Sequence, residues 1–351
     1  MKLEKIKRSN TISSFNINFM KKIFFLFITI AYLNIAFARQ IDTLINLSPV
    51  NFSTDFTKYN QKTAVYLAQL SDLAYAKDMK SFNSFINKYI QSYPGILLRS
   101  EFLVEKSKNT DTQILLWATR DFVVLSFRGT EITRRNIITD LKYFSYEFSD
   151  SVSRQRYFNL PAGHAGFRKA IMNLVDRTDI FGRIETILRQ TYPGRNIKQI
   201  PVYLTGHSLG GALASMFAEP LTVNKYTVNG LYLFAPALTI SCTEKVFMEN
   251  KFGHFTYNIV NYKDYIPRAG LRGTLAHYGK FYRICNDSTL SNEPERYVEM
   301  RLFEKKNVYK YHSLTTYINL LDLSINTDEV VSKRKSDCFF KMNIIHPCAR
   351  E

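Results

Sequence analysis

Motifs that mark metal-binding and repeat proteins are missing from this sequence of 351 residues. Its four cysteines do not follow the spacing of a zinc site, and it contains no D-x-D-x-D-G loop of the kind that binds calcium. It also has no internal repeat and no low-complexity linker that would divide it into domains. The sequence therefore predicts one large globular domain with no metal ion and no cofactor.

Acidic side chains are comparatively few, with 30 Asp and Glu against 47 Lys and Arg, which gives a formal net charge of +17. A basic surface favours anionic partners such as acidic lipid headgroups or nucleic acid. No nucleic-acid-binding motif accompanies the charge, and the basic residues are scattered along the chain rather than gathered in a stripe. We therefore expect no nucleic-acid partner, and solubility alone could account for the charge.

The first 38 residues have the features of a targeting segment. Two lysines precede the apolar run of residues 23–33, and Ala36-Phe37-Ala38 offers an A-x-A cleavage site before Arg39. Met20 is an alternative start that would give a leader of ordinary length. This pattern predicts a signal peptide over residues 1–38 and export to a secreted or periplasmic location. The alternative is an uncleaved membrane anchor, for which the apolar run is short.

All four cysteines lie in the part of the chain that would be exported. They are Cys242, Cys285, Cys338 and Cys348. An even number of cysteines in an oxidising compartment predicts disulfide bonds, and four cysteines allow three connectivities. A bond between Cys338 and Cys348 would close a short loop and leave Cys242 to pair with Cys285. We expect this pairing, although the sequence leaves the other two open.

Hydrophobic patterning predicts strands that alternate with helices along most of the chain. The expected helices are Thr63–Tyr75, residues 81–90 and Lys169–Gln190, and the expected strands are Ile114–Ala118, Phe122–Phe127, Val202–Leu204, Gly230–Phe234, Thr256–Asn261 and Phe281–Cys285. This order predicts an α/β fold with a mainly parallel central sheet flanked by helices. We place the main domain at residues 39–321 and interpret residues 322–351 as a cysteine-containing C-terminal extension.

The segment Pro201–Pro220 carries the strongest functional signal. An apolar strand ends at the sequence Gly-His-Ser-Leu-Gly-Gly, and a helix of small residues follows it. This strand–turn–helix context is that of the G-x-S-x-G nucleophile elbow, in which the serine occupies a strained turn. Glycines are needed at Gly206 and Gly210, where the strand and the helix approach closely. The pattern predicts that Ser208 is a nucleophile.

Three further motifs accompany the elbow. FRGT spans residues 127–130 at the end of a predicted strand, HAGF spans residues 164–167, and NYKDYIPR spans residues 261–268. Together with GHSLGGA, and in this order, they make the chain resemble the class 3 lipase family, which includes the fungal triacylglycerol lipases. The resemblance extends from about Leu115 to Tyr317. It implies an α/β-hydrolase fold, a Ser-Asp-His triad and hydrolysis of carboxylic esters.

The catalytic base can be sought by elimination among the histidines. The six are His164, His207, His254, His277, His312 and His346. In hydrolases of this type the order along the chain is Ser, then Asp, then His, so the base follows both Ser208 and the acid. His277 resembles a His-x-Gly segment of the family that is not catalytic. His312 resembles the family's catalytic His-hydrophobic-x-x-Tyr segment, with the tyrosine one position late at Tyr317, and we predict that it is the base.

The resemblance also implies the remaining parts of the site. Asp264 matches the acid of the family's Asn-x-x-Asp-x-(Val/Ile)-Pro-(Arg/His) segment and would orient His312. The backbone N–H of Leu209 and residue Thr130 would form the oxyanion hole. Arg128 would brace the FRGT loop. Residues His164 and Gly166 of HAGF would be structural.

Residues 131–141, EITRRNIITDL, correspond to the lid of the family. An isoleucine replaces the family's tryptophan in this stretch. Its apolar and basic side chains are Ile132, Arg134, Arg135, Ile137 and Ile138. A short amphipathic element of this kind could turn its apolar face to a lipid surface, with the arginines favouring anionic bilayers. An ordinary surface helix is the equally weighted alternative.

The sequence predicts an exported serine hydrolase that acts on lipid esters, either triacylglycerol or glycerophospholipid, and contacts a lipid interface. A second possibility is an esterase for small or feruloyl-type esters. A third is a lipid-binding protein on a hydrolase scaffold without catalysis.

Overall fold

The computed structural model describes residues 47–49, 52–106, 111–129, 148–149, 153–155, 158–270, 274–284, 290–292, 298–299, 308–323 and 348. The chain separates into two units, Met1–Leu47 and Ser48–Glu351, and the fold described below belongs to the second. The predicted signal peptide lies outside the described residues. Within these ranges no helix has both the length and the apolar character to cross a membrane.

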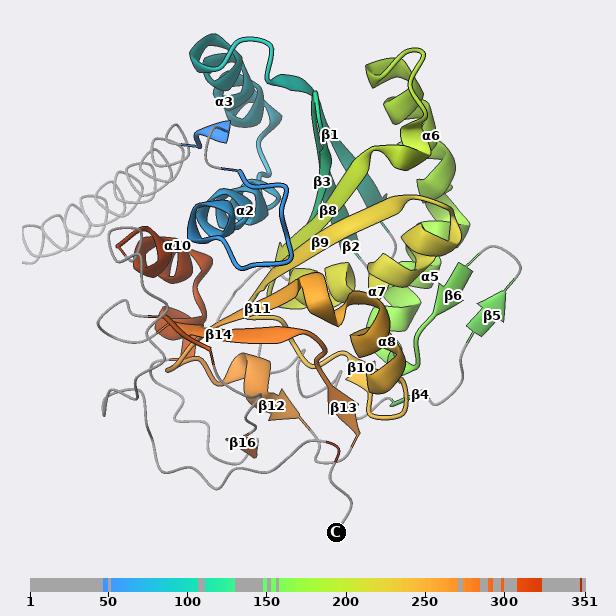
Figure 1. Ribbon diagram of the computed structural model, residues 1–351, viewed down its shortest axis with the longest axis vertical. Helices are drawn as coiled ribbons and strands as arrows, with labels where there is room; N and C mark the ends of the chain where they lie inside the picture. The colour runs from blue at the N-terminus through green and yellow to red at the C-terminus, as the bar shows by residue number, and fades with distance from the viewer. Residues whose placement is uncertain are drawn as a thin grey trace, which may run out of the picture. The chain divides into compact units, whose positions relative to one another are not determined.

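An eight-stranded sheet forms the centre of the second unit (Figure 1), in the order β1-β2-β3-β8-β9-β11-β14-β15. Its strands are β1 Leu97–Lys106, β2 Asp111–Thr119, β3 Val123–Phe127, β8 Pro201–His207, β9 Thr227–Phe234, β11 Thr256–Asn261, β14 Lys280–Ile284 and β15 Leu290–Asn292. The five strands from β3 to β14 run parallel to one another, whereas β1, β2 and β15 are antiparallel to their neighbours. The predicted mainly parallel sheet is confirmed.

Helices cover both faces of this sheet. Helices α2 (Gln61–Leu73) and α10 (Leu314–Leu323) lie on one face, and α5 (Ala165–Thr178), α6 (Ile180–Thr191) and α7 (Leu209–Val223) lie on the other (Figure 1). The remaining helices are α3 Met79–Ser92, α8 Lys245–Phe252, α9 Val308–His312 and the 3-10 turns η2 Ile197–Gln199, η3 Gly253–Phe255 and η4 Ile266–Arg268. This arrangement buries apolar side chains on both sides of the central strands, as a parallel sheet requires.

Short strands form three smaller sheets. Strands β13 (Leu275–Ala276), β10 (Ile240–Ser241), β7 (Gly163–His164) and β4 (Phe148–Ser149) make one in that order. The pairs are β12 (Ala269–Gly270) with β16 (Val298–Glu299), and β5 (Ser153–Gln155) with β6 (Phe158–Leu160). Hydrophobic patterning did not predict them, because strands of two or three residues are too short to show a period.

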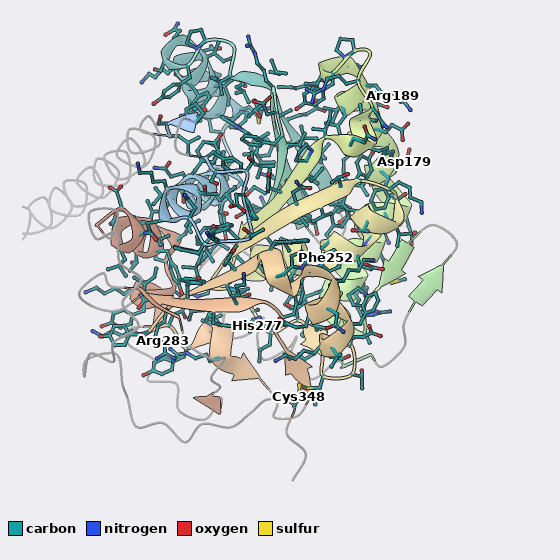
Figure 2. The ribbon with its side chains drawn as sticks, in the orientation of Figure 1. Asp179, Arg189, Phe252, His277, Arg283 and Cys348 are labelled. Carbon is teal, nitrogen blue, oxygen red and sulfur yellow. A yellow bond between two sulfur atoms is a disulfide. The ribbon has the colours of Figure 1, made fainter. Side chains whose placement is uncertain are left out.

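One predicted helix is wrong in its extent. Residues Lys169–Gln190 do not form a single helix, because Asp179 adopts left-handed backbone angles of φ 45° and ψ 51°. Its side chain then caps α6 by accepting the Gly182 N–H at 3.3 Å (Asp179 is labelled in Figure 2). Aspartate tolerates this conformation better than most residues, since its short polar side chain bonds locally. The apolar stripe continues across the break, which is why periodicity alone missed it.

Aromatic side chains fasten the segment before α2 to one face of the sheet. Phe52 stacks on Phe122 with ring centroids 4.1 Å apart, and Tyr59 stacks on Tyr282 at the same separation. Stacked aromatic pairs contribute beyond the area that they bury. This N-terminal segment is therefore part of the folded core rather than a loose arm.

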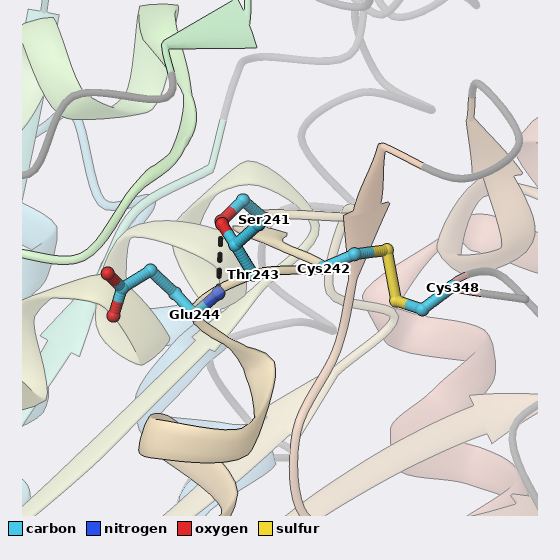
Figure 3. Close-up of a disulfide and its surroundings, with 5 residues drawn as sticks. All are labelled: Ser241, Cys242, Thr243, Glu244 and Cys348. Carbon is cyan, nitrogen blue, oxygen red and sulfur yellow. Dashed lines mark hydrogen bonds between the residues drawn. A yellow bond between two sulfur atoms is a disulfide. The ribbon is translucent and has the colours of Figure 1, made fainter. Parts of the chain in front are cut away.

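The expected disulfide pairing is wrong. Cys242 is bonded to Cys348, with their Cα atoms 5.4 Å apart at a sequence separation of 106 (Figure 3). Cys242 directly follows strand β10, so the bond fastens a residue near the C-terminus to the sheet that contains β7 and β13. The short-loop argument failed because pairing depends on which segments meet in three dimensions. Cys285 and Cys338 lie outside the described residues.

Candidate active site

Ser208 stands in the sharp turn between β8 and α7. Its backbone angles are φ 57° and ψ −123°, a strained combination for a residue with a side chain. The neighbouring structure holds it there, because the Ser208 N–H donates to the Phe234 carbonyl at 2.9 Å and the Ser208 carbonyl accepts from Ala212 at 3.2 Å. The turn directs the hydroxyl away from helix capping, since Ser208 makes no side-chain capping bond to α7.

The glycines of the turn are required by close backbone approach. A Cβ atom at Gly210 would collide with the Phe127 carbonyl oxygen and lie 2.8 Å from the nitrogen of Gly129. A Cβ atom at Gly206 would lie 2.5 Å from the carbonyl carbon of Gly210. Because the atoms that a Cβ would meet at either position belong to the backbone, they could not shift without distorting the turn. The turn, the helix start and the end of strand β3 are thus packed directly on one another.

His312, at the end of the short helix α9, joins Ser208 to Asp264. Its Nε2 lies 2.8 Å from the Ser208 hydroxyl oxygen, and its Nδ1 lies 2.7 Å from an oxygen of the Asp264 carboxylate. A carboxylate only accepts hydrogen bonds, so Nδ1 carries the proton and Nε2 presents a lone pair to the hydroxyl. His312 and Asp264 are fully buried, and Ser208 is 7% exposed. The structure therefore brings the three predicted triad residues together.

Asp264 follows strand β11, where the strand gives way to the turn η4. One oxygen of its carboxylate accepts the Ile266 N–H at 3.0 Å, and the other accepts the Tyr317 hydroxyl at 2.7 Å as well as the His312 Nδ1–H. A buried carboxylate needs such donors because it has lost its contact with water. The guanidinium of Arg268 holds the turn itself by bonding the carbonyl oxygens of Tyr262 and Asp264, each at 2.6 Å.

Tyr317 is a site residue whose contact the sequence analysis did not predict. Its hydroxyl donates to Asp264 and accepts the Asn261 N–H at 2.8 Å. Burial, with the charge of Asp264 beside it, raises the pKa of Tyr317 well above its usual value, so the hydroxyl stays protonated as a donor. The tyrosine of the His-hydrophobic-x-x-Tyr segment was the available signal. Its late position is accommodated because α10 starts afresh after His312.

His207 directly precedes Ser208 in the chain and also touches His312. Its Nε2 is 2.7 Å from the main-chain oxygen of His312, its Nδ1 is 3.1 Å from the Tyr75 hydroxyl, and the two imidazole rings have centroids 4.8 Å apart. The residue is 1% exposed. Burial, reinforced by the neighbouring His312, lowers the pKa of His207 well below its usual value. In the sequence, the elimination among the histidines gave His207 no part in the site.

The other histidines of the described residues have structural contacts. The Nδ1 of His164 accepts the Gly166 N–H at 3.1 Å and so caps helix α5, while burial lowers the pKa of His164 to about 4. The Nε2 of His277 lies 2.8 Å from the main-chain oxygen of Pro267, beside the turn that carries the acid (Figure 2). His254 is exposed.

The oxyanion-hole and lid predictions are covered only in part by the described residues. Leu209 is the first residue of α7, where main-chain N–H groups lack partners within the helix. Arg128 reaches the Gln113 side-chain oxygen at 3.3 Å and so links the FRGT strand to β2. Thr130 lies outside the described residues, as do the lid residues Ile132, Arg134, Arg135, Ile137 and Ile138. Their roles stay predictions.

Acidic, histidine and cysteine side chains do not gather into a metal site in the described part of the chain. No group of three or more of them is placed there to hold an ion.

Comparison with known proteins bears on the fold and the family. Residues 124–273 match the family described as lipase (class 3). The Lip2 lipase from Yarrowia lipolytica is similar in structure, with a TM-score of 0.54 and 16% identity over 72% of this chain and 92% of that chain. A lipase from Rhizopus microsporus var. chinensis is similar with a TM-score of 0.44 and 20% identity, over 70% of this chain and 75% of that one. The Yarrowia likeness supports the fold alone.

The parallel sheet, the strand–turn–helix around Ser208 and the Yarrowia likeness define an α/β-hydrolase fold. Within that class, residues 124–273 match the class 3 lipase family, and the chain is an enzyme of the lipase and carboxylic ester hydrolase type. The matched segment contains Ser208 and Asp264, whereas His312 lies beyond it. The place of His312 in the site therefore rests on its geometry.

Proposed function

We propose that this enzyme hydrolyses lipid esters through a triad of Ser208, His312 and Asp264. The observation that supports it is the unbroken hydrogen-bonded series from the Ser208 hydroxyl through both nitrogens of His312 to the Asp264 carboxylate. A serine hydroxyl is a weak nucleophile until a neighbouring base accepts its proton. The neutral Nε2 of His312, at 2.8 Å from the hydroxyl oxygen, is that base.

The reaction proceeds in two halves. In the first, Ser208 Oγ attacks the ester carbonyl carbon while its proton passes to His312 Nε2, and the tetrahedral intermediate collapses as that proton moves to the departing alcohol. In the second, water attacks the acyl-enzyme with His312 again as the base, which releases the fatty acid and restores Ser208. Asp264 keeps His312 in the correct tautomer and balances the charge of the imidazolium.

The oxyanion would form at the start of helix α7. The Leu209 N–H is the donor next to the nucleophile, and the aligned peptides of a helix N-terminus add partial positive charge. Thr130 would supply the second donor. Its predecessor Gly129 supports this assignment, because a Cβ atom on Gly129 would lie 2.6 Å from the His207 carbonyl oxygen and 3.4 Å from the Gly210 nitrogen. The FRGT strand therefore ends against the turn that holds Ser208.

Triacylglycerol or glycerophospholipid is the proposed substrate class, and the excess of basic over acidic residues, which persists without the predicted signal peptide, favours an anionic lipid interface. Arg134 and Arg135 of the predicted lid would contribute to that attraction. Reversing both charges, with Arg134→Glu and Arg135→Glu, should then lower hydrolysis on anionic vesicles more than on zwitterionic ones. Unchanged activity on anionic vesicles would mean that the lid does not recognise charge.

Export is a proposal that is supported by the sequence of residues 21–38, with its lysine pair, apolar run and Ala36-Phe37-Ala38 site. A mature N-terminus at Arg39, read from the protein recovered outside the cytoplasm, would support it. Recovery in the membrane with the segment intact would favour the anchored alternative.

The test of the triad is hydrolysis of p-nitrophenyl esters from short to long acyl chains, with and without anionic phospholipid vesicles. Ser208→Ala should lower kcat by roughly 10⁴-fold or more. Ser215→Ala is the matched control, because Ser215 is a buried serine of α7 whose hydroxyl bonds the main-chain oxygen of Ala212. Activity confined to short esters would indicate the esterase alternative. If Ser208→Ala did not differ from the wild type, Ser208 would have no catalytic role, and the alternative of a lipid-binding protein on a hydrolase scaffold would stand.

A further inference from the structure

Among the histidines that the structure describes, His207 is the one that contacts both the turn of Ser208 and the base His312. It precedes Ser208 in the chain, and its Nε2 lies 2.7 Å from the main-chain oxygen of His312. That oxygen belongs to the last residue of helix α9, where carbonyl groups lack partners within the helix. The contact therefore meets a need of the backbone that carries the base.

The contacts of His207 fix its tautomer. A carbonyl oxygen only accepts, so the Nε2 of His207 must carry the proton. Its Nδ1 is then an acceptor, and the Tyr75 hydroxyl, 3.1 Å away, is the donor. Tyr75 follows helix α2, so this series of bonds runs from the α2 side of the sheet through His207 to His312.

We infer that His207 is a positioning residue, which holds the main chain of His312 so that its imidazole stays aligned between Ser208 and Asp264. This inference rests on the proposed triad. Ser208 and His207 bind the two ends of the same residue, the one at its ring and the other at its carbonyl. Because His207 ends β8 and Ser208 follows it directly, a displacement of α9 would have to break the His207 bond before it could separate Nε2 from the hydroxyl.

Burial suits His207 to this task. The side chain is 1% exposed, and its imidazole packs on that of His312 at a centroid separation of 4.8 Å. During the reaction His312 becomes an imidazolium, and a second charge on the adjacent ring would oppose it. The low pKa of His207 keeps this ring neutral, so that it orients the base without competing for the proton.

The same cluster reaches the strand that precedes the predicted oxyanion loop. A Cβ atom on Gly129 would collide with the Tyr75 hydroxyl oxygen and lie 2.6 Å from the His207 carbonyl oxygen. Tyr75, Gly129 and His207 are therefore in mutual contact range. A smaller or differently shaped side chain at residue 207 would therefore loosen the end of β3 as well as the backbone of His312.

The test separates hydrogen bonding from packing at residue 207. His207→Leu removes the donor, whereas His207→Gln retains an amide N–H near the position of Nε2. We expect His207→Leu to lower kcat roughly 10- to 100-fold with KM changed less than about threefold, because small misplacements of a catalytic group are costly. His207→Gln should recover kcat to within about fivefold of the wild type. The rate of covalent labelling of Ser208 by a fluorophosphonate should follow the same order.

Control variants distinguish the possible failures. His164→Asn replaces another buried histidine, which caps α5, and should leave kcat within about twofold of the wild type. If His207→Leu does not fold, Tyr75→Phe is the variant to test instead. It removes the hydrogen-bond donor to Nδ1 of His207 and should lower kcat about two- to tenfold at unchanged KM. Wild-type kcat in folded His207→Leu, or no recovery in folded His207→Gln, would overturn the positioning role. Equal activity of the wild type and Ser208→Ala would instead overturn the triad, and the inference with it.

Discussion

Tyr317 shows at the scale of single residues how much the buried acid depends on its donors. Its hydroxyl gives a hydrogen bond to Asp264 and receives one from the Asn261 N–H, and its side chain is fully buried. Tyr317→Phe would leave the N–H without its acceptor and the carboxylate with one donor fewer. We expect the free energy of unfolding to fall by about 1–3 kcal/mol. We also expect kcat to fall roughly three- to tenfold, because Asp264 would be held less firmly.

Thermal unfolding and p-nitrophenyl ester kinetics measure both effects. Tyr226→Phe is the matched control, since the Tyr226 hydroxyl is buried and makes no hydrogen bond within the described structure. Its removal should leave stability unchanged or raise it. If Tyr317→Phe and Tyr226→Phe behaved alike, the contact with Asp264 would have no functional weight.

The sequence could identify some site residues and not others for a physical reason. The roles of Ser208 and Asp264 could be predicted from local sequence. The glycines of a tight turn indicate Ser208, and a motif at the end of a strand indicates Asp264. The prediction of His312 required the order of residues along the chain together with its likeness to the family's His-hydrophobic-x-x-Tyr segment. The contacts of His207 with Tyr75 and with the His312 carbonyl join residues 132 and 105 positions apart. No local sequence pattern indicates contacts between residues so far apart, so the role of His207 could not be predicted.

At the scale of elements, a buried histidine replaces the usual cap of helix α5. His164 accepts the Gly166 N–H through Nδ1, and burial lowers the pKa of His164 to about 4. The unfolded chain binds a proton near the usual pKa of 6.5, whereas the folded protein resists protonation until about pH 4. The contribution of His164 to stability is therefore present above pH 6.5 and is lost as the pH falls toward 4.

His164→Asn should remove this sensitivity and keep the cap, because asparagine is a favoured N-cap residue. Between pH 7.5 and pH 5, the free energy of unfolding of the wild type should fall by roughly 2 kcal/mol more than that of His164→Asn. Denaturant unfolding at a series of pH values measures the difference, and it also cancels the similar effect of His207. Replacement of the exposed His254 by asparagine serves as the control. Parallel pH profiles for the wild type and His164→Asn would contradict the assignment.

Helices and strands could be predicted where a single hydrophobic period continued along the whole element. Strand β11 has the predicted bounds, and α2 and α3 differ from the predicted helices by two residues at each end. The predicted helix Lys169–Gln190 failed because one apolar stripe spans two helices, and the left-handed conformation of Asp179 between them leaves no mark on that stripe. Strand β1, which pairs only with β2 at the edge of the sheet, was not predicted.

At the scale of the whole molecule, the disulfide was the feature that the sequence could not supply. Three connectivities satisfy four cysteines, and loop length favoured the wrong one because it ignores where β10 lies in the fold. The bond between Cys242 and Cys348 instead closes a loop of 106 residues. Asp264 and His312 both lie between the two cysteines in the sequence, so the constraint encloses two of the three residues of the proposed triad.

A long closed loop restricts the unfolded chain more than the folded one, which stabilises the fold by roughly 2–5 kcal/mol. Cys242→Ser and Cys348→Ser should each lower the free energy of unfolding by about that amount, and the double variant should lose no more than either single one, because all three lack the same bond. Denaturant unfolding under non-reducing conditions measures the losses. Additive losses would mean that each cysteine stabilises the fold through separate contacts. The main-chain N–H of Glu244 donates to the Ser241 hydroxyl beside Cys242 (Figure 3), so this hydrogen bond should still hold the start of α8 when the disulfide is removed. We therefore expect the variants to remain folded at 25 °C.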